Sequence, residues 1–421
     1  MKILHFSDVH GEDTNHEEIK RCVDYMVETA WKVKPDAIIC SGDIINSKYL
    51  QADSKSLKYM SSYFRELSNI APIAVIIGTD SHEGRISETL RNVSGKYSIH
   101  VSTTVEQILL CETPGQLFWR VFNSGMIGIN VKLIVSQVPP PTKEFWKNRQ
   151  GIEKDNQNIS QAMASIFTNF GVMAKQYPNV PHVLNGHFSM QGSKISETQL
   201  LPGTDISIGK DILAMANADL YCLGHIHMKQ EYQITDSTKA FHSGSIFRKN
   251  FGERKEDKGF YIHTLTGNDY DLDSYKFVKT PSREMGQVEF NLIESPWMLD
   301  DPEQDFVSKA VDICSEWCNI EAWLKIKITA WTDDVRQINQ AKLKRDLLEA
   351  GAKHVVIEID RVRRENSREE EIIKAASLPE KAKALEAHRS QPMPDGCIEF
   401  FENVETLNKE DLVKYALNQI N

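Results

Sequence analysis

The sequence lacks the features that mark membrane proteins, secreted proteins and disulfide-linked proteins. No apolar run approaches the roughly 18 residues that a membrane span needs, and no signal-peptide pattern precedes the first predicted strand. The seven cysteines are scattered and form no Cys-x-x-Cys pair, as is usual for chains in a reducing compartment. We therefore expect a cytoplasmic protein that does not associate with a membrane.

An excess of positive charge is also absent, because 59 acidic residues outnumber 49 basic residues and give a net charge of −10. Proteins that hold nucleic acid unaided usually expose a basic surface, since phosphate neutralisation dominates their affinity. The charge balance therefore argues against tight DNA binding by this chain alone. It does not argue against an enzyme whose metals and partner supply the positive charge.

The first third of the chain has the pattern of a parallel sheet. Short apolar runs predict buried strands at residues 3–6, 37–40 and 73–77, and the stretches between them have the apolar spacing of helices. A capping box, Thr14-Asn-His-Glu17, predicts the start of the first helix. Strands and helices that alternate in this way form parallel βαβ units, so we expect an α/β protein.

The pattern changes near Pro281, and this change predicts a domain boundary. Beyond it, a strand at residues 323–330, a helix at 335–350 and a strand at 355–359 predict a compact βαβ unit. Charged residues then crowd between positions 361 and 371, which is typical of a solvated linker or an exposed helix.

Polar side chains follow the predicted strands at the points where the strands end. The clusters are Asp8 with His10, Gly42-Asp43, His82-Glu83, Gly186-His187, and Gly224-His225 with His227. The carboxyl ends of parallel strands meet at one edge of a sheet, where ligands bind. Any single member is explained as a turn residue or a core histidine. The ordered set of carboxylates and imidazoles predicts a site for divalent metals.

The order and spacing of these clusters resemble the calcineurin-like metallophosphoesterases, whose pattern is D-x-H, G-D, G-N-H-D/E, G-H and G-H-x-H. The match spans roughly residues 1–265. Within that superfamily the chain is similar to the SbcD-type nucleases of DNA double-strand-break repair. The segments that carry the narrower likeness are Ser243-Gly-Ser245, Phe251-Gly-Glu253 and Lys258-Gly-Phe260.

The resemblance implies a fold, partners and an activity. It implies a four-layer αββα sandwich at residues 1–280, a small βαβ capping and DNA-binding domain at 281–362, and a linker with a helical tail at 363–421. The tail is expected to bind the coiled-coil ATPase SbcC. A homodimer using two manganese ions is expected to attack DNA ends as a 3′-to-5′ exonuclease and endonuclease in repair and recombination.

The resemblance also implies roles for individual residues. The implied metal donors are Asp8, His10 and His227 for one ion, His187 and His225 for the other, and Asp43 as the bridge. His82 takes the place of the histidine that assists the leaving group. Two such metals clamp a phosphodiester and activate water for attack. Mixed nitrogen and oxygen ligation suits manganese, iron or zinc.

The sequence departs from the family pattern at two places. The G-N-H-D/E motif is replaced by Gly78-Thr-Asp-Ser-His-Glu83, which is two residues longer and has no asparagine. The missing oxygen donor to the second metal must then come from Ser81, the choice by alignment, or from Asp80, the better donor chemically. The nuclease branch often has a histidine three residues after the bridging aspartate, and Asn46 stands there.

These departures keep two other functions open. The first is a phosphodiesterase or phosphatase that uses the same metals on a phosphoester other than DNA. The second is a scaffold that has lost catalysis and keeps a partner-binding tail. Hydrolysis of bis-p-nitrophenyl phosphate with manganese separates the scaffold from the enzymes, and degradation of DNA ends separates the two enzymes.

Overall fold

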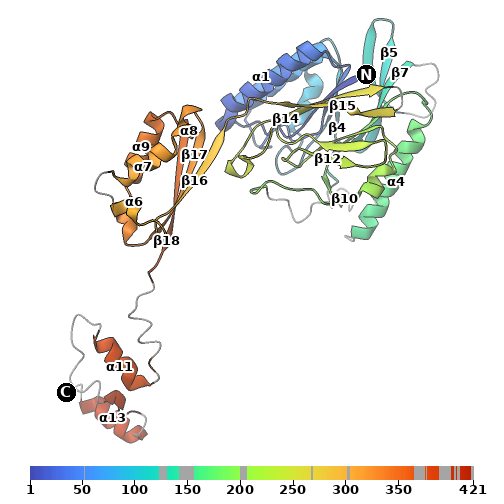
Figure 1. Ribbon diagram of the computed structural model, residues 1–421. Helices are drawn as coiled ribbons and strands as arrows, with labels where there is room; N and C mark the ends of the chain where they lie inside the picture. Colours follow the sequence, from blue (N-terminus) through green and yellow to red (C-terminus); the bar gives the residue numbers. More distant parts are fainter. Residues whose placement is uncertain are drawn as a thin grey trace. The chain divides into compact units, whose positions relative to one another are not determined.

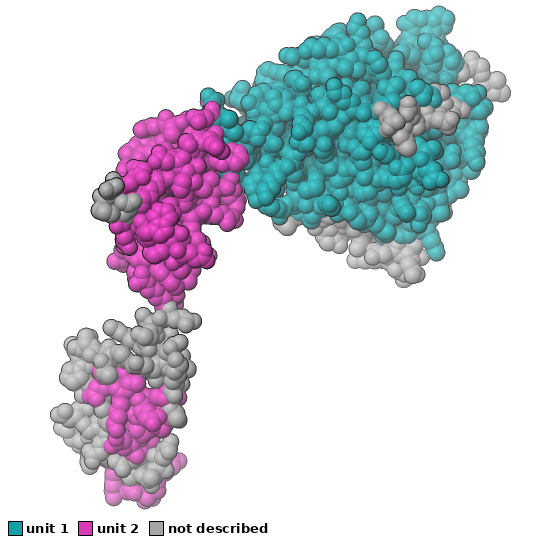
Figure 2. All heavy atoms as spheres, in the orientation of Figure 1, with its two compact units in different colours: residues 1–286, 320–323 teal, residues 287–319, 324–421 magenta. Residues whose placement is uncertain are grey.

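The computed structural model describes all residues except 52, 123–129, 142–155, 200–205, 267–268, 301–303, 365–374, 376, 388–399, 403, 405–407 and 419–421. The described residues form two compact units, which Figure 2 shows in different colours. Unit 1 comprises residues 1–286 and 320–323, and unit 2 comprises residues 287–319 and 324–421. The expected division into three domains remains a prediction, and much of its linker lies outside the described residues.

The first sheet of unit 1 has the order β15-β14-β1-β2-β3-β4. Its strands are β1 (Lys2–Phe6), β2 (Ala37–Cys40), β3 (Ile73–Ile76), β4 (Ile99–Ser102), β14 (Gly259–Thr266) and β15 (Asp269–Lys279). Strands β1 to β4 are parallel, whereas β14 runs antiparallel to β1 and to β15. Helices α1 (His16–Val33) and α2 (Lys55–Ile70) make the crossovers that parallel strands require.

The start of α1 differs from the sequence prediction. A 3₁₀ turn, η1 (Asp13–Asn15), precedes the helix, and Asn15 takes the N-cap position without a side-chain capping hydrogen bond. The predicted capping box at Thr14 is therefore wrong, because the chain turns once more before the helix begins.

The second sheet of unit 1 has the order β12-β13-β11-β8-β7-β5-β6. Its strands are β5 (Glu106–Thr113), β6 (Gln116–Val121), β7 (Asn130–Val138), β8 (His182–His187), β11 (Leu220–Gly224), β12 (Gln230–Gln233) and β13 (Lys239–His242). Strands β7, β8, β11 and β13 are parallel. Other elements of the unit are α4 (Asn156–Ala174), α5 (Lys210–Ala214), β9 (Ser189–Met190), β10 (Ser207–Ile208), η2 (Ile86–Asn92) and η3 (Phe251–Glu253).

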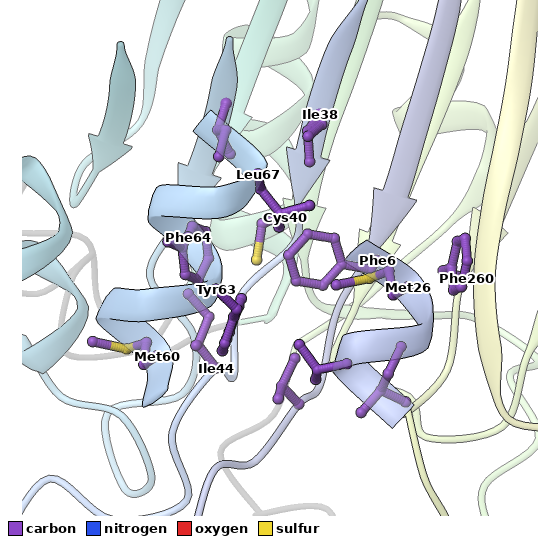
Figure 3. Close-up of a cluster of buried hydrophobic side chains, with 14 of the residues drawn as sticks. Phe6, Met26, Ile38, Cys40, Ile44, Met60, Tyr63, Phe64, Leu67 and Phe260 are labelled. Carbon is purple, nitrogen blue, oxygen red and sulfur yellow. The ribbon is translucent and has the colours of Figure 1, made fainter. Parts of the chain in front are cut away.

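Three apolar clusters define the layers of unit 1. Helices α1 and α2 pack on the first sheet through a cluster that includes Phe6, Met26 and Phe64 (Figure 3). The faces between the sheets share a second cluster, and α4 and α5 cover the far face of the second sheet through a third. Helices α1 and α4 accordingly lie on opposite sides of the strands (Figure 1). The predicted α/β class is confirmed, and the layers run helix, sheet, sheet, helix.

Unit 2 contains a three-stranded sheet of order β16-β17-β18, with helices packed against it. The elements that lie wholly or mostly in unit 2 are β16 (Met285–Asn291), α6 (Trp297–Asp300), α7 (Phe306–Ile313), α8 (Ser315–Asn319), β17 (Trp323–Trp331), η4 (Asp334–Gln337), α9 (Gln340–Glu349), β18 (His354–Val362), α11 (Leu378–Ala387) and α13 (Lys409–Asn418).

The helix predicted at residues 335–350 begins later than expected. The N-cap residue of α9 is Asn339, whose side chain accepts a hydrogen bond from the backbone N–H of Lys342 at 2.9 Å. This local bond sets the start of the helix at Gln340, and a separate 3₁₀ turn occupies the residues before it.

Among the helices that the structure describes, none combines the length and apolar character of a bilayer span.

Candidate metal centre

The loops after β1 and β2 lie side by side and are joined through their backbones. The N–H of Asp8 donates to the carbonyl of Gly42 at 3.0 Å, and the N–H of His10 donates to the carbonyl of Asp43 at 2.9 Å. The parallel pairing of the two strands therefore continues past their ends. Three of the predicted metal donors stand on this joined segment.

Four of the predicted donors have left-handed backbone conformations. The φ angles are 52° at Asp8, 46° at His10, 52° at Asp43 and 87° at His225. Such conformations cost about 1–3 kcal/mol each in residues other than glycine and persist only where the surroundings enforce them. The hydrogen bonds between the loops enforce them here, and the resulting sharp turns at strand ends carry the donor side chains.

Two glycines let the loops approach each other closely. A Cβ atom on Gly78 would lie 2.1 Å from the backbone nitrogen of Asp43. Gly42 has a φ of +86°, and a Cβ there would lie 2.8 Å from Nδ1 of His187. Any larger residue would push the loops apart, so both glycines are required by the packing of the site.

The structure gathers six predicted donors into two groups. Asp8, His10 and His227 form one group, and Asp43, His187 and His225 form the other; in each group the donor atoms lie within 4.8 Å of one another. All six side chains are buried or nearly so. They come from both sheets, because β1 and β2 belong to the first sheet and β8 and β11 to the second.

Inside the groups, nitrogen lone pairs and carboxylate oxygens face one another. The Nε2 atoms of His10 and His227 are 2.9 Å apart. Nε2 of His187 is 3.3 Å from a carboxylate oxygen of Asp43, and Nε2 of His10 is 3.9 Å from the same residue. Asp43 thus contacts histidines of both groups, which is the geometry of a bridging carboxylate.

The outer nitrogens of two imidazoles are fixed by hydrogen bonds. Nδ1 of His187 donates to the carbonyl of Ser41 at 2.6 Å, and Nδ1 of His227 donates to the carboxylate of Glu253 at 2.9 Å. The ammonium of the buried Lys258 lies 3.0 Å from the same carboxylate. Such partners fix the tautomer that leaves Nε2 as a metal ligand and raise the basicity of the ring.

The arrangement therefore fits two divalent cations. Buried carboxylates and Nε2 atoms converge, and their outer nitrogens are held in the tautomer that metal ligation needs. The mixture of oxygen and imidazole donors suits manganese, iron or zinc.

Burial and mutual attraction shift the protonation equilibria of this centre. Burial raises the pKa of Asp8. Burial also acts to raise the pKa of Asp43, but the neighbouring His187 outweighs it and holds that pKa well below its usual range. Burial of the His187 imidazole opposes its protonation, yet the Asp43 carboxylate raises its pKa to about 9. The two residues form an ion pair when no cation is bound.

The carboxylate of Glu83 is buried beneath the centre. It accepts hydrogen bonds from the backbone N–H groups of Ile44, at 2.8 Å, and Gly78, at 3.2 Å. It therefore joins the loops after β2 and β3. Burial, reinforced by the nearby Asp43, raises the pKa of Glu83 to about 7.

The loop at 78–83 places a different residue at the centre from the one expected. Thr79 donates to Asp43 through its backbone N–H at 2.6 Å and through its hydroxyl at 3.2 Å, and its hydroxyl lies 3.2 Å from Nε2 of His187. Ser81 is exposed and does not line the cavity, and Asp80 is exposed and pairs with Lys48. The structure therefore does not bring Ser81 or Asp80 to either donor group.

The sequence did not indicate Thr79, because alignment on His82 places the missing donor at the residue before it, Ser81. The better signal was its position directly after Gly78, the residue that closes on Asp43. The sequence marks Glu253 only as part of a segment shared with the SbcD-type nucleases, because its contact with His227 joins residues that are distant in the sequence.

A cavity of about 230 Å³ opens onto the centre. Its lining residues are Asp43, Thr79, His82, Thr198, Gln199, His225, His227, Lys249, Asn250 and Glu253. The ring of His82 contacts the ring of His10 edge-on, with centroids 5.2 Å apart. Burial lowers the pKa of His82, although Asp43 opposes this effect. His82 thus stands beside the donor groups and faces the space in which a phosphoester would be held.

A third group of possible metal ligands lies in the core between the sheets. It consists of His5, Cys222 and His263, which are fully buried. His5 already shares a hydrogen bond with the hydroxyl of Ser41 at 3.0 Å. Burial lowers the pKa of His263 to about 3 and raises the pKa of the Cys222 thiol well above its usual value. These residues are neutral parts of the core.

The two buried groups of carboxylates and imidazoles lie at the strand ends of a double sheet, and this arrangement is consistent with a dimetal site. The sequence profile of the calcineurin-like phosphoesterases matches residues 1–229, which is more than half of the 421 residues. The chain belongs to this family, and the predicted superfamily is confirmed.

More specific similarities are weaker. The chain is 25% identical over 301 residues to the SbcD component of the nuclease SbcCD from Staphylococcus epidermidis, covering 69% of this chain and 72% of that protein. Among solved structures, GAP50, the anchor in the inner membrane complex of Plasmodium, matches with 13% identity and a TM-score of 0.40, covering 67% of this chain and 89% of its own. A dimetal phosphatase from Danio rerio matches with 6% identity and a TM-score of 0.39, covering 66% of this chain and 99% of its own.

Metal binding at the group that contains His187 is expected to release a proton. The pKa of the metal-free imidazole is raised to about 9, so the ring is protonated at neutral pH, whereas a metal ligand must be neutral. The apparent affinity for Mn²⁺ should therefore rise by up to about tenfold per pH unit as the pH approaches 9. Calorimetric titrations in buffers of different ionisation enthalpy count the released protons. An affinity independent of pH between 6.5 and 8.5 would contradict this prediction.

We predict that Thr79, and not Ser81, supports the second metal. Thr79→Ala removes the hydroxyl that contacts Asp43 and His187, and it should lower the affinity for the second Mn²⁺ by about tenfold, as loss of such supporting contacts typically does. Ser81→Ala is the matched control, because it removes a hydroxyl from an exposed residue of the same loop, and it should bind both ions normally. Equal losses in the two variants, or a loss in Ser81→Ala alone, would restore the expected role of Ser81.

Proposed function

We propose that this chain is a metal-dependent DNA nuclease that processes DNA ends together with an SbcC-like ATPase. The observation that carries the proposal is the contact between Glu253 and His227. Glu253 belongs to one of the segments on which the likeness to the SbcD-type nucleases rests, and here it orients a predicted metal donor. The similarity to the nuclease component from Staphylococcus epidermidis supports the same function.

In the proposed mechanism Asp8, His10 and His227 would hold one ion, and His187 and His225 would hold the other with support from Thr79. Asp43, which contacts histidines of both groups, would be shared by the two ions. When bound, two such ions polarise the phosphodiester and activate water for in-line attack. We propose Mn²⁺ as the native metal, which tolerates the mixed nitrogen and oxygen donors.

The side chains of the protein carry out the remaining tasks. Glu253 holds Nδ1–H of His227 and keeps its Nε2 available. Ser41 does the same for His187 through its carbonyl. As the bond between phosphorus and the leaving oxygen breaks, that oxygen gains negative charge, and His82 donates a proton or a hydrogen bond to it. Help of this kind from a general acid contributes about 10²- to 10⁴-fold to the rate.

The second candidate function is hydrolysis of a phosphoester other than DNA. Two observations favour it: the loop from Gly78 to Glu83 lacks the family asparagine, and Asn46 replaces a histidine that is common in the nuclease branch. Both enzymes would hydrolyse bis-p-nitrophenyl phosphate. Only the nuclease would shorten linear duplex DNA in the presence of Mn²⁺ and the ATPase partner.

We propose that the end of the chain binds the partner and that the chain works as a homodimer. Helices α11 and α13 have ten residues each, which is too short for stability alone in water. Leu378, Leu385 and Val413 are 49%, 42% and 54% exposed. Exposed apolar side chains on short helices suit insertion into a groove of a coiled-coil partner.

Variants of Asp43 and His82 should separate metal binding from turnover. Asp43→Asn should abolish cleavage and weaken metal binding, because it removes the shared carboxylate. His82→Ala should bind both ions but lose about 10²- to 10⁴-fold in kcat on DNA, because its role is to assist the leaving group. Metal content by mass spectrometry and DNA shortening are measured on the same preparations. If His82→Ala loses an ion, His82 is a ligand and the proposed role is wrong.

Truncation after Ser377 tests the partner site. The shortened chain should keep its metals and nuclease activity and should no longer co-purify with the ATPase. A full-length variant that carries Leu385→Asp and Val413→Asp changes only exposed apolar positions. It should also fail to co-purify with the ATPase. Aggregation or loss of metal in the truncated chain would show that the tail belongs to the folded core.

A further inference from the structure

A lysine lines the cavity beside the metal centre. Lys249 lies between β13 and η3, is half-buried, and shares the cavity wall with Asp43, His82 and Glu253. Burial is the main cause of the lowered pKa of His82, and the positive charge of Lys249 lowers that pKa further. The ammonium therefore stands close to the place where the leaving group would be.

Lys249 is held at both ends. Its backbone N–H donates to the Glu253 carboxylate at 2.9 Å, so the residue that orients His227 also positions this lysine. Its ammonium donates to the side-chain oxygen of Asn46 at 2.6 Å, and Asn46 in turn donates to Glu12 at 2.8 Å. Asn46 is thus the anchor of a fixed cation in this chain.

The ammonium of Lys249 keeps its charge available to a ligand. Among the residues that the structure describes, none places a carboxylate in an ion pair with it, and the neutral Asn46 is its hydrogen-bond partner. An ammonium has three donors, so two remain after the bond to Asn46. By contrast, Lys48 and Lys258 are paired with carboxylates.

A neutral amide stands next to this cation in the sequence and lines the same cavity. Asn250 lines the same wall, and its side-chain oxygen accepts from the backbone N–H of Gly252 at 2.9 Å and from the hydroxyl of Thr198. Because the oxygen faces those partners, the NH₂ group of the same amide points away from them. Lys249 and Asn250 both line the cavity, and an ammonium and an amide NH₂ are hydrogen-bond donors of the kind that bind anions.

We propose that Lys249 and Asn250 form a second phosphate subsite, which binds the phosphate adjacent to the scissile one in a substrate with several phosphates. This inference deepens the proposed nuclease function and rests on it. The scissile phosphate belongs at the metal donors, whereas Lys249 is anchored to Asn46 and Glu12 outside the two donor groups. A cavity of about 230 Å³ also has room for more than one phosphate group.

The subsite also explains how an acidic chain can hold a polyanion. With a net charge of −10, the chain repels nucleic acid at long range. Affinity must then come from cations placed where the backbone phosphates lie. A fixed lysine next to the metal centre supplies such a charge at short range.

The subsite can be tested by calorimetric titration of the manganese-loaded full-length protein with thymidine phosphates. Thymidine 3′,5′-bisphosphate carries two phosphates at the spacing of a nucleic acid backbone, and the 3′- and 5′-monophosphates carry one. The native protein should bind the bisphosphate about tenfold more tightly than the better monophosphate, as one hydrogen bond to a charged group allows.

In Lys249→Met this preference should fall to about one, and Lys249→Arg should keep most of it. Lys255→Met is the matched control, because it removes an equal charge from an exposed residue of the same segment and should keep the native ratio. The measured quantity is a ratio of dissociation constants within one variant, so changes in turnover do not affect it.

Two results would overturn the subsite: no preference in the native protein, or an unchanged preference in Lys249→Met, whether the affinities in that variant stay the same or weaken equally for the monophosphates and the bisphosphate. Equal weakening would place Lys249 on the scissile phosphate. The titration requires no DNA cleavage, so it fails independently of the nuclease proposal. A protein that prefers the bisphosphate but leaves DNA intact would refute only the nuclease.

Discussion

The structure of unit 1 depends on the burial of two carboxylates and four imidazoles in one small volume. Taking charged groups out of water is costly unless opposite charges and hydrogen bonds compensate. Without metal, the ion pair of Asp43 and His187 supplies part of this compensation. The joined loops, the left-handed turns and the glycines at 42 and 78 hold these groups together against their own desolvation cost. Divalent cations would complete the balance of charge.

Much of the centre could be predicted because its donors follow parallel strands. Asp8 and Asp43 stand two and three residues after the ends of β1 and β2, and His187 ends β8. Parallel strands bring their carboxyl ends to one edge of a sheet. The contacts that the sequence did not indicate depend on geometry that no spacing encodes. In the loop at 78–83, Thr79 contacts the centre because Gly78 closes on Asp43. The carboxylate of Glu253 reaches His227 only through the tertiary fold.

Element boundaries show the same limit. The strand at 323–330 was predicted from its alternation, and the structure has β17 at Trp323–Trp331 with every second side chain buried. The two helix starts that failed, at Thr14 and at residue 335, were decided by single local contacts or an additional turn. Periodicity reports which face of an element is buried, and it says little about where the first turn begins. Part of the expected tail, at residues 388–399, lies outside the described residues.

The position of β1 within its sheet has a consequence for synthesis. β1 pairs with β2 on one side and with β14, at Gly259–Thr266, on the other. At about 5–20 residues per second, a ribosome needs on the order of tens of seconds to proceed from one of these strands to the other. During that time β1 has an unpaired edge, which is a hazard for aggregation. Asp8 and His10 are also synthesised long before His187, His225 and His227. The complete set of donors therefore exists only after the sheet closes.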